Sequence, residues 1–188
     1  MAVTTTNLIQ GAATLYIGNL GATEPTDTDL TTDPATPDWT DVGGTNDGVK
    51  LSVDQSYTEL EVDQLVDRVG SRLTKRDITV ETTLAEPTLV NLTWVMNSGT
   101  VSSGSGWQAL EPEFATSATQ PKYRALLFDG YAPGQLRRRV IVRKVLSTDA
   151  FEMAYTKEDK TTIPVKWAAH YVSPSVAPFR IVDEKSAA

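Results

Sequence analysis

The sequence predicts a mainly β protein with one short helix and one unusually long β-hairpin. Threonine is abundant and clustered, as at 4–6, 31–32, 82–83 and 161–162, and β-branched residues favour strands over helices. Several segments alternate apolar and polar residues with the period of two that indicates a half-buried strand. Apolar residues recur at helical spacing most clearly within 87–97.

Composition limits the class of protein. A chain of 188 residues with 40% hydrophobic content suits a single domain over 1–188 with its own core. The net charge of −7 argues against nucleic-acid binding, because such binding depends on Lys and Arg that neutralise phosphates. The absence of cysteine and the single histidine, His170, exclude thiolate chemistry and multi-histidine metal sites.

The N-terminus and the hydrophobic runs bear on location. Met1-Ala2-Val3-Thr4 lacks the basic and apolar regions of a signal peptide. No apolar run approaches the ~20 residues that span a bilayer. We therefore expect a protein that is made and soluble in the cytoplasm and does not insert into a membrane.

The first strand is expected within 12–18, followed by a long loop. Residues 19–38 combine three prolines with many acidic residues and threonines, which predicts a solvated surface loop. Asp27-Thr28-Asp29 only superficially resembles a calcium loop, because the required glycine and final glutamate are missing.

Residues 49–84 are expected to form the long hairpin. From Val49 to Val53 the apolar side chains occupy odd positions, and the alternation then reverses, which indicates a bulge near Gln55–Thr58. The returning arm alternates from 75 to 84. Each arm is far longer than the usual strand of ~5–6 residues.

A hairpin of this length is unstable on its own in water, and open strand edges tend to pair with other chains. We therefore expect neighbouring copies of the chain to cover its distal end. The side chains expected at these contacts are Tyr57, Glu59, Leu60, Glu61, Asp63, Leu65, Val66, Arg68 and Val69.

The predicted helix spans 87–97. Pro87 suits a first helical turn, Leu89, Leu92 and Met96 form an apolar stripe, and Gly99 follows the end. The next segment, 98–121, opens with a Gly/Ser run and is expected to be a flexible insert.

Further strands are expected at 122–129, 136–147, 151–155 and 163–171. A turn from Gly130 to Gly134 separates the first two, and Pro164 places the start of the last at an edge or bulge. The C-terminal tail, 173–188, is expected to be extended or loose.

No set of residues predicts catalysis or a cofactor, so we expect a protein that is not an enzyme. His170 lies on the polar face of its strand without an identifiable catalytic partner. Arg137, Arg138 and Arg139 do not form one basic surface, because Arg138 points away from its neighbours on an alternating strand. We expect these arginines to form salt bridges between subunits.

The segment Trp39–Val49, W-T-D-V-G-G-T-N-D-G-V, resembles the opening of the tail tube (major tail) proteins of siphophages. Tyr57–Gln64, the return arm to Glu86 and the helix follow in the order of that family. The resemblance is specific over residues 39–97. From there to residue 172, only the order of the elements agrees with that family.

The resemblance implies a β-sandwich or barrel with one flanking helix and a protruding hairpin. Copies would form rings, typically six-fold, that stack head to tail into a tube for the genome. The chain would then lie in the virion tail, after assembly in the bacterial host cytoplasm. It would contact itself, a tape measure protein, a tail terminator and a distal tail protein, while DNA passes without specific binding.

An acidic lumen would repel DNA phosphates. Alternation gives the expected lumen residues: Lys50, Ser52, Asp54, Asp77, Thr79 and Glu81. The same face would otherwise contact solvent or the next ring.

Two other classes remain open from the sequence. One is a different ring-forming component, such as a tail terminator or a type VI secretion tube subunit. The other is a monomeric β-sandwich that binds carbohydrate through Trp39 and Trp107.

Overall fold

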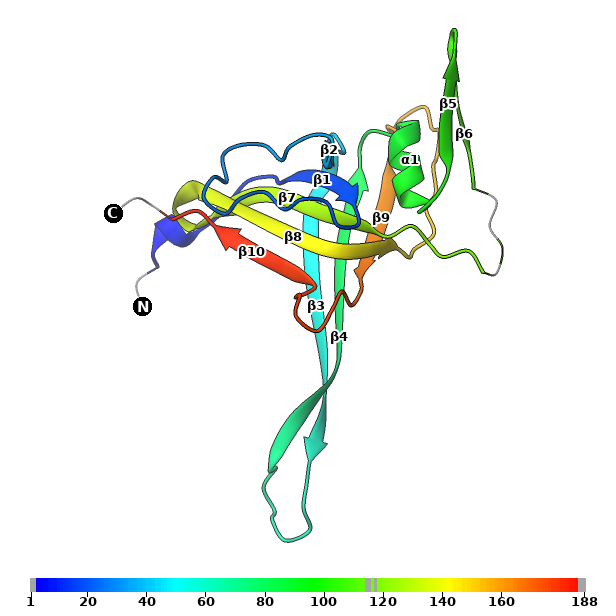
Figure 1. Cartoon of the computed structure of the whole chain (residues 1–188). Coiled ribbons are helices and arrows are strands. Elements are labelled where there is room, and N and C mark those ends of the chain that lie inside the picture. The colour runs from blue at the N-terminus through cyan, green and yellow to red at the C-terminus, as the bar shows by residue number, and fades with distance from the viewer. Residues whose placement is uncertain (1–2, 114–115, 117, 186–188) are drawn as a thin grey trace.

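A computed structural model describes residues 3–113, 116 and 118–185. It is mainly β with one short helix, as predicted (Figure 1). The elements are β1 (Thr14–Asn19), β2 (Trp39–Asp41), β3 (Thr45–Leu60), β4 (Gly70–Leu84), α1 (Leu89–Val95), β5 (Thr100–Gly104), β6 (Trp107–Glu111), β7 (Arg124–Ala132), β8 (Leu136–Ser147), β9 (Ile163–Ala169) and β10 (Phe179–Asp183). Two 3₁₀ turns, Thr5–Asn7 and Pro133–Gln135, complete them.

The main sheet is antiparallel and has the order β2-β1-β7-β8-β9-β4-β3, with β10 also paired to β8. Strands β10 and β9 follow one another along β8, at Arg138–Val142 and Val145–Ser147 respectively. Figure 1 shows β7 and β8 crossing β3, β4 and β9 at a steep angle. The sheet therefore bends and packs against itself as the layers of a β-sandwich do.

The apolar core lies between the two parts of the bent sheet. Leu126 and Val142 come from β7 and β8, Val80 from β4, and Trp167, which is 1% exposed, from β9. Helix α1 contributes Leu92 and other side chains to the same cluster. The alternation that the sequence shows on these strands therefore sends one face of each strand into a common core.

Helix α1 is shorter than the predicted 87–97. It begins after Thr88, whose hydroxyl accepts a hydrogen bond from the Asn91 N–H at 3.1 Å. This is the N-cap arrangement, so Pro87 precedes the helix, and the prediction that it lies in the first turn is wrong. Leu92 is buried and Leu89 half-buried. A helix this short is stable mainly through such packing.

Truncation of Leu92 to alanine should lower the free energy of unfolding by about 2–5 kcal/mol, since it removes buried methyl groups from a packed site. Val90→Ala on the exposed side of the same helix should change it by no more than about 0.5 kcal/mol. Urea unfolding, at a concentration too low for assembly, measures both. Equal losses would show that α1 does not pack as described.

The loop predicted to be solvated, 19–38, instead covers part of the sheet. Leu30 and Pro34 are buried within it. The indole N–H of Trp39 donates to the carbonyl of Thr23 at 2.8 Å. A second apolar cluster, on the face of β1, β7 and β8 opposite the core, includes Trp39. Polar composition alone did not reveal this covering role.

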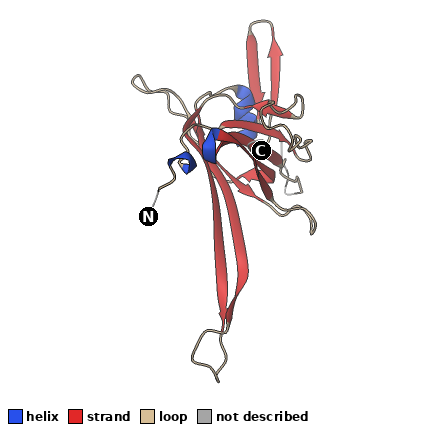
Figure 2. Cartoon of the chain, turned by 90° about the vertical axis from the view of Figure 1, so that its left-hand side faces the viewer, coloured by secondary structure: helices blue, strands red, loops and turns tan. Residues whose placement is uncertain are grey.

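The prediction of a flexible insert over 98–121 is wrong for its first part. Strands β5 and β6 form a second hairpin that extends away from the body at the end opposite to the long hairpin (Figures 1 and 2). The Trp107 ring lies directly over Gly104, where a Cβ would be 2.7 Å from the ring. Glycine here permits a close cross-strand contact rather than flexibility. Residues 114–115 and 117 lie outside the described part.

Two smaller predictions also need correction. Residues 151–155 form no strand, although Phe151 and Met153 contact the core. Gly130 lies within β7, so the turn begins only at Pro133. The tail predicted to be extended or loose contains an extended strand, β10, which pairs with β8 over Arg138–Val142. Residues 186–188 lie outside the description.

Candidate functional site

The long hairpin is present and extends away from the rest of the chain (Figures 1 and 2). Strands β3 and β4 pair from Thr45↔Leu84 to Leu60↔Gly70. Strand β9 pairs with β4 only over Thr79–Leu84. Within the described residues, the distal part of the hairpin therefore has no third strand.

The part of the hairpin beyond its pairing with β9, residues 53–77, exposes many apolar side chains, and we call it the distal hairpin. The large ones are Val53, Tyr57, Leu60, Val62, Leu65, Val66, Val69 and Leu73. The residues predicted to contact other copies on this hairpin, which include Glu59, Glu61, Asp63 and Arg68, are all exposed. Concentrated apolar exposure of this kind is typical of an interaction surface.

The predicted bulge is present. Pairing is irregular between Ser56 and Tyr57, but the additional residue is Thr74 on the opposite strand. Its hydroxyl donates to the Ser56 carbonyl at 3.0 Å. A second irregularity includes Asp47 and Gly48, both with left-handed φ angles, of 60° and 72°. Bulges increase local twist, and the first lies in the part of the hairpin without a third strand.

Strands β3 and β4 present one continuous polar face. Their register pairs Lys50 with Glu81, Ser52 with Thr79 and Asp54 with Asp77, so the six expected lumen residues do share a face. Strand β9 adds Lys166, the register partner of Glu81. The opposite face of the same strands carries Val80 into the core. We call this surface the polar face, and it extends along β4 to Lys75.

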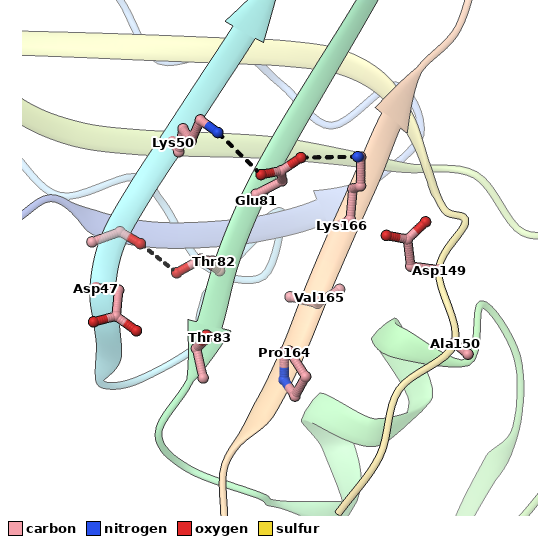
Figure 3. Close-up of a pocket in the computed structure, with 11 residues that line it drawn as sticks. Asp47, Lys50, Glu81, Thr82, Thr83, Asp149, Ala150, Pro164, Val165 and Lys166 are labelled. Atoms are coloured by element: carbon pink, nitrogen blue, oxygen red, sulfur yellow. Dashed lines mark hydrogen bonds and ion pairs between the residues drawn. The ribbon is translucent and has the colours of Figure 1, made fainter.

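Glu81 forms the centre of an ion-pair row across three strands (Figure 3). Its carboxylate lies 3.4 Å from Lys50 Nζ and 2.9 Å from Lys166 Nζ. The hydrogen bond from Lys166 lowers the pKa of Glu81, and the same contact raises the pKa of Lys166. Glu81 and Lys166 are therefore both charged at neutral pH. They line a groove of about 420 Å³, together with Asp47 and Asp149.

The polar face is balanced in charge rather than acidic. Among the described residues of β3, β4 and β9, its cations are Lys50, Lys75 and Lys166, and its carboxylates are Asp54, Asp77 and Glu81. Lys75 lies 2.5 Å from Asp77, which raises the pKa of Lys75. Alternation along the returning arm already placed Lys75 on the same side as Asp77 and Glu81, whereas Lys166 joins this face only through the pairing of β9 with β4.

Two of the three consecutive arginines pair within the chain. Arg139 is 2% exposed and binds both Asp129 oxygens at 2.6 and 2.7 Å. Arg138 binds both Asp183 oxygens at 2.6 and 2.7 Å. The expectation of inter-subunit salt bridges is therefore not retained for these two. Arg137 lies 5.6 Å from the centre of the Tyr131 ring, as in a cation–π contact.

Other candidate functions lose support from the geometry. Trp39 is 1% exposed and offers no surface for a sugar, although Trp107 is exposed. His170 is half-buried, with its ring centre 5.2 Å from that of Tyr123. Among the described residues, no cluster of metal-binding side chains occurs. No described helix is long and apolar enough to cross a bilayer.

Comparison with known proteins identifies the family. A family model described as "Phage tail tube protein" matches residues 1–182. No curated protein matches the sequence. The chain therefore belongs to the phage tail tube proteins, which are structural components of the virion tail and not enzymes.

Proposed function

We propose that this chain assembles into rings, six-fold as the family resemblance suggests, which stack into the conduit for viral DNA. The distal hairpin is the observation that carries the proposal. Its strands lack a third strand within the described chain, and both of its faces are exposed. Burial of apolar surface contributes roughly 25 cal/mol for each Å², so contacts between copies along this hairpin would be strongly stabilising.

The open edges of the sheet fit ring formation. Strand β3 lies at one end of the strand order and β10 has β8 as its only partner in the described chain. Pairing between copies around a closed ring would satisfy such edges. A head-to-tail contact between rings then generates an open filament. The distal hairpin, which projects from the body, suits contacts of either kind.

The polar face is the surface that we assign to the lumen. It is the outward side of β3, β4 and β9, whose other side forms the core. Its lysines are all in ion pairs with carboxylates of the same chain, so it offers DNA no excess positive charge. In this role the chain would also meet a tape measure protein along the tube, and terminator and distal tail proteins at its ends.

The amides of Leu60–Val69 should exchange hydrogen rapidly in the unassembled chain and slowly in the tube. In the described structure, Leu65 N–H and Val69 N–H donate to carbonyls within this segment, those of Val62 and Leu60. Hydrogen exchange measured by mass spectrometry on both forms tests this, with β8 as the internal reference.

Electron microscopy of the concentrated protein provides the second readout, with long tubes as the expected result. Closed rings that do not stack would instead favour a terminator-like component. Monomers without assembly, together with equal exchange in dilute and concentrated samples, would contradict the proposal.

A further inference from the structure

Glu81 is shared by two lysines, and this makes it different from the other carboxylates of the polar face. Figure 3 shows Lys50 and Lys166 on either side of Glu81, on the strands that flank β4. Within the described part of the chain, Asp77 pairs with one lysine, Lys75. Asp54 forms no ion pair among the described residues, and its register partner is another carboxylate, Asp77.

We propose that Glu81 is the residue that keeps DNA from binding to the channel wall, because it holds Lys50 and Lys166 in ion pairs that phosphates would otherwise form. This inference rests on the proposed lumen role of the polar face. It assigns low affinity for DNA to local pairing of each lysine rather than to an acidic surface, since the face has equal numbers of cations and carboxylates.

The geometry explains why one carboxylate serves two cations. Adjacent strands lie ~4.8 Å apart, so a side chain on the middle strand reaches both neighbours. Its two oxygens are divided between the lysines, Oε2 to Lys50 and Oε1 to Lys166. Asp47 and Asp149 line the same groove but form no ion pair with either lysine in the described structure.

Loss of Glu81 would leave two ammonium groups within one groove. Each phosphate contact releases condensed counterions, and the contributions of several contacts add in the logarithm of the affinity. In a ring, every copy would contribute its own pair of lysines. A single substitution would therefore leave Lys50 and Lys166 without their ion-pair partner in every copy, repeated in every ring along the tube.

Glu81→Gln and Asp54→Asn form a matched pair of variants. Each removes one negative charge from the polar face, so a mechanism based on net charge predicts equal effects. Under our proposal only Glu81→Gln frees lysines, and its effect should be much larger. Both side chains are accessible to solvent, and exposed ion pairs contribute little to folding, so both variants should fold normally.

The first experiment measures binding of a fluorescent 20-nucleotide single-stranded DNA to the unassembled chain at low salt. Glu81→Gln should bind at least about tenfold more tightly than Asp54→Asn, and the difference should disappear as salt rises. The triple variant Lys50→Gln, Glu81→Gln, Lys166→Gln should lose the gain. Equal affinities for Glu81→Gln and Asp54→Asn would overturn the proposal.

The second experiment measures the rate of DNA release from purified particles after adsorption to host cells. Glu81→Gln should slow release several-fold more than Asp54→Asn. A chain with Asp54→Lys, Asp77→Lys and Glu81→Lys tests the lumen assignment independently of pairing.

The two experiments separate the possible failures. If Glu81→Gln gains DNA affinity but neither it nor the triple-lysine chain slows release, Glu81 controls the lysines and the lumen assignment is wrong. If the triple-lysine chain slows release and Glu81→Gln gains no affinity, the face lines the lumen and the role of Glu81 is wrong. If the chain with Asp54→Lys, Asp77→Lys and Glu81→Lys fails to assemble into tails, the polar face lies at an interface between subunits instead.

Discussion

Replacing Asp129 with alanine is expected to lower the free energy of unfolding of the unassembled chain by about 3–5 kcal/mol. Arg139 is 2% exposed, and Asp129 is its only carboxylate partner among the described residues. The third contact of this guanidinium is the Thr32 carbonyl at 2.9 Å, and Nη1 has no partner in the described structure. Removal of the carboxylate therefore leaves a buried charge without a counter-charge, held by the Thr32 carbonyl alone among the described residues.

Asp183→Ala is the matched control, because it also removes a carboxylate that binds both nitrogens of an arginine on β8. The Arg138–Asp183 pair is accessible to solvent, so its loss should cost only about 0–1 kcal/mol. Urea unfolding distinguishes the two. Similar losses for both variants would show that water reaches Arg139 and that the pair is not buried as described.

Shortening the long hairpin is expected to abolish tube formation without destabilising the chain. Gln55 and Arg76 are register partners, so an Asn-Gly turn can join them in place of residues 56–75. The deleted residues are exposed except for the half-buried Gly70, and they contribute little to the core. Electron microscopy of the concentrated variant, together with its melting temperature when dilute, measures the two effects separately.

A chain of full length that carries Leu65→Ser and Val66→Ser is the companion variant. It keeps the backbone of the hairpin and removes two of its exposed apolar side chains. We expect it to require a higher concentration for assembly than the unmodified chain. Tubes of normal length from the shortened chain would refute the proposed role of the distal hairpin.

Much of the hairpin and of the polar face could be predicted from alternation alone. Side chains on a strand alternate between its two faces, so the grouping of Lys50, Ser52 and Asp54 is a local property of the sequence. The register of the two arms then brought Asp77, Thr79 and Glu81 opposite them. The turn at Pro133–Gln135 carries a similar local signal for the pairing of Asp129 with Arg139. It pairs Ala132 with Leu136, and counting outward from that pair places Asp129 opposite Arg139.

Contacts between distant segments were decided only by the tertiary structure. Glu24 of the covering loop binds Arg143, and Asp27 binds Arg180 near the C-terminus. Composition predicted a solvated loop and an extended or loose tail, because no local pattern records that a carboxylate will meet an arginine more than 100 residues later. The same limit applied to Lys166, whose position on β9 was predicted and whose partner Glu81 was not.

The sequence by itself determined β1, β7, β8 and β9, the long hairpin of β3 and β4, and the sides to which their residues point, since these follow from the geometry of the extended backbone and from turns. The tertiary structure decided which strands became neighbours and therefore which charges came together. Pairing of β9 with β4 placed Lys166 against Glu81 and so added a positive charge to a face expected to be acidic. Ion pairs act over a few ångströms, so they depend on the packed arrangement of the chain rather than on its order of residues.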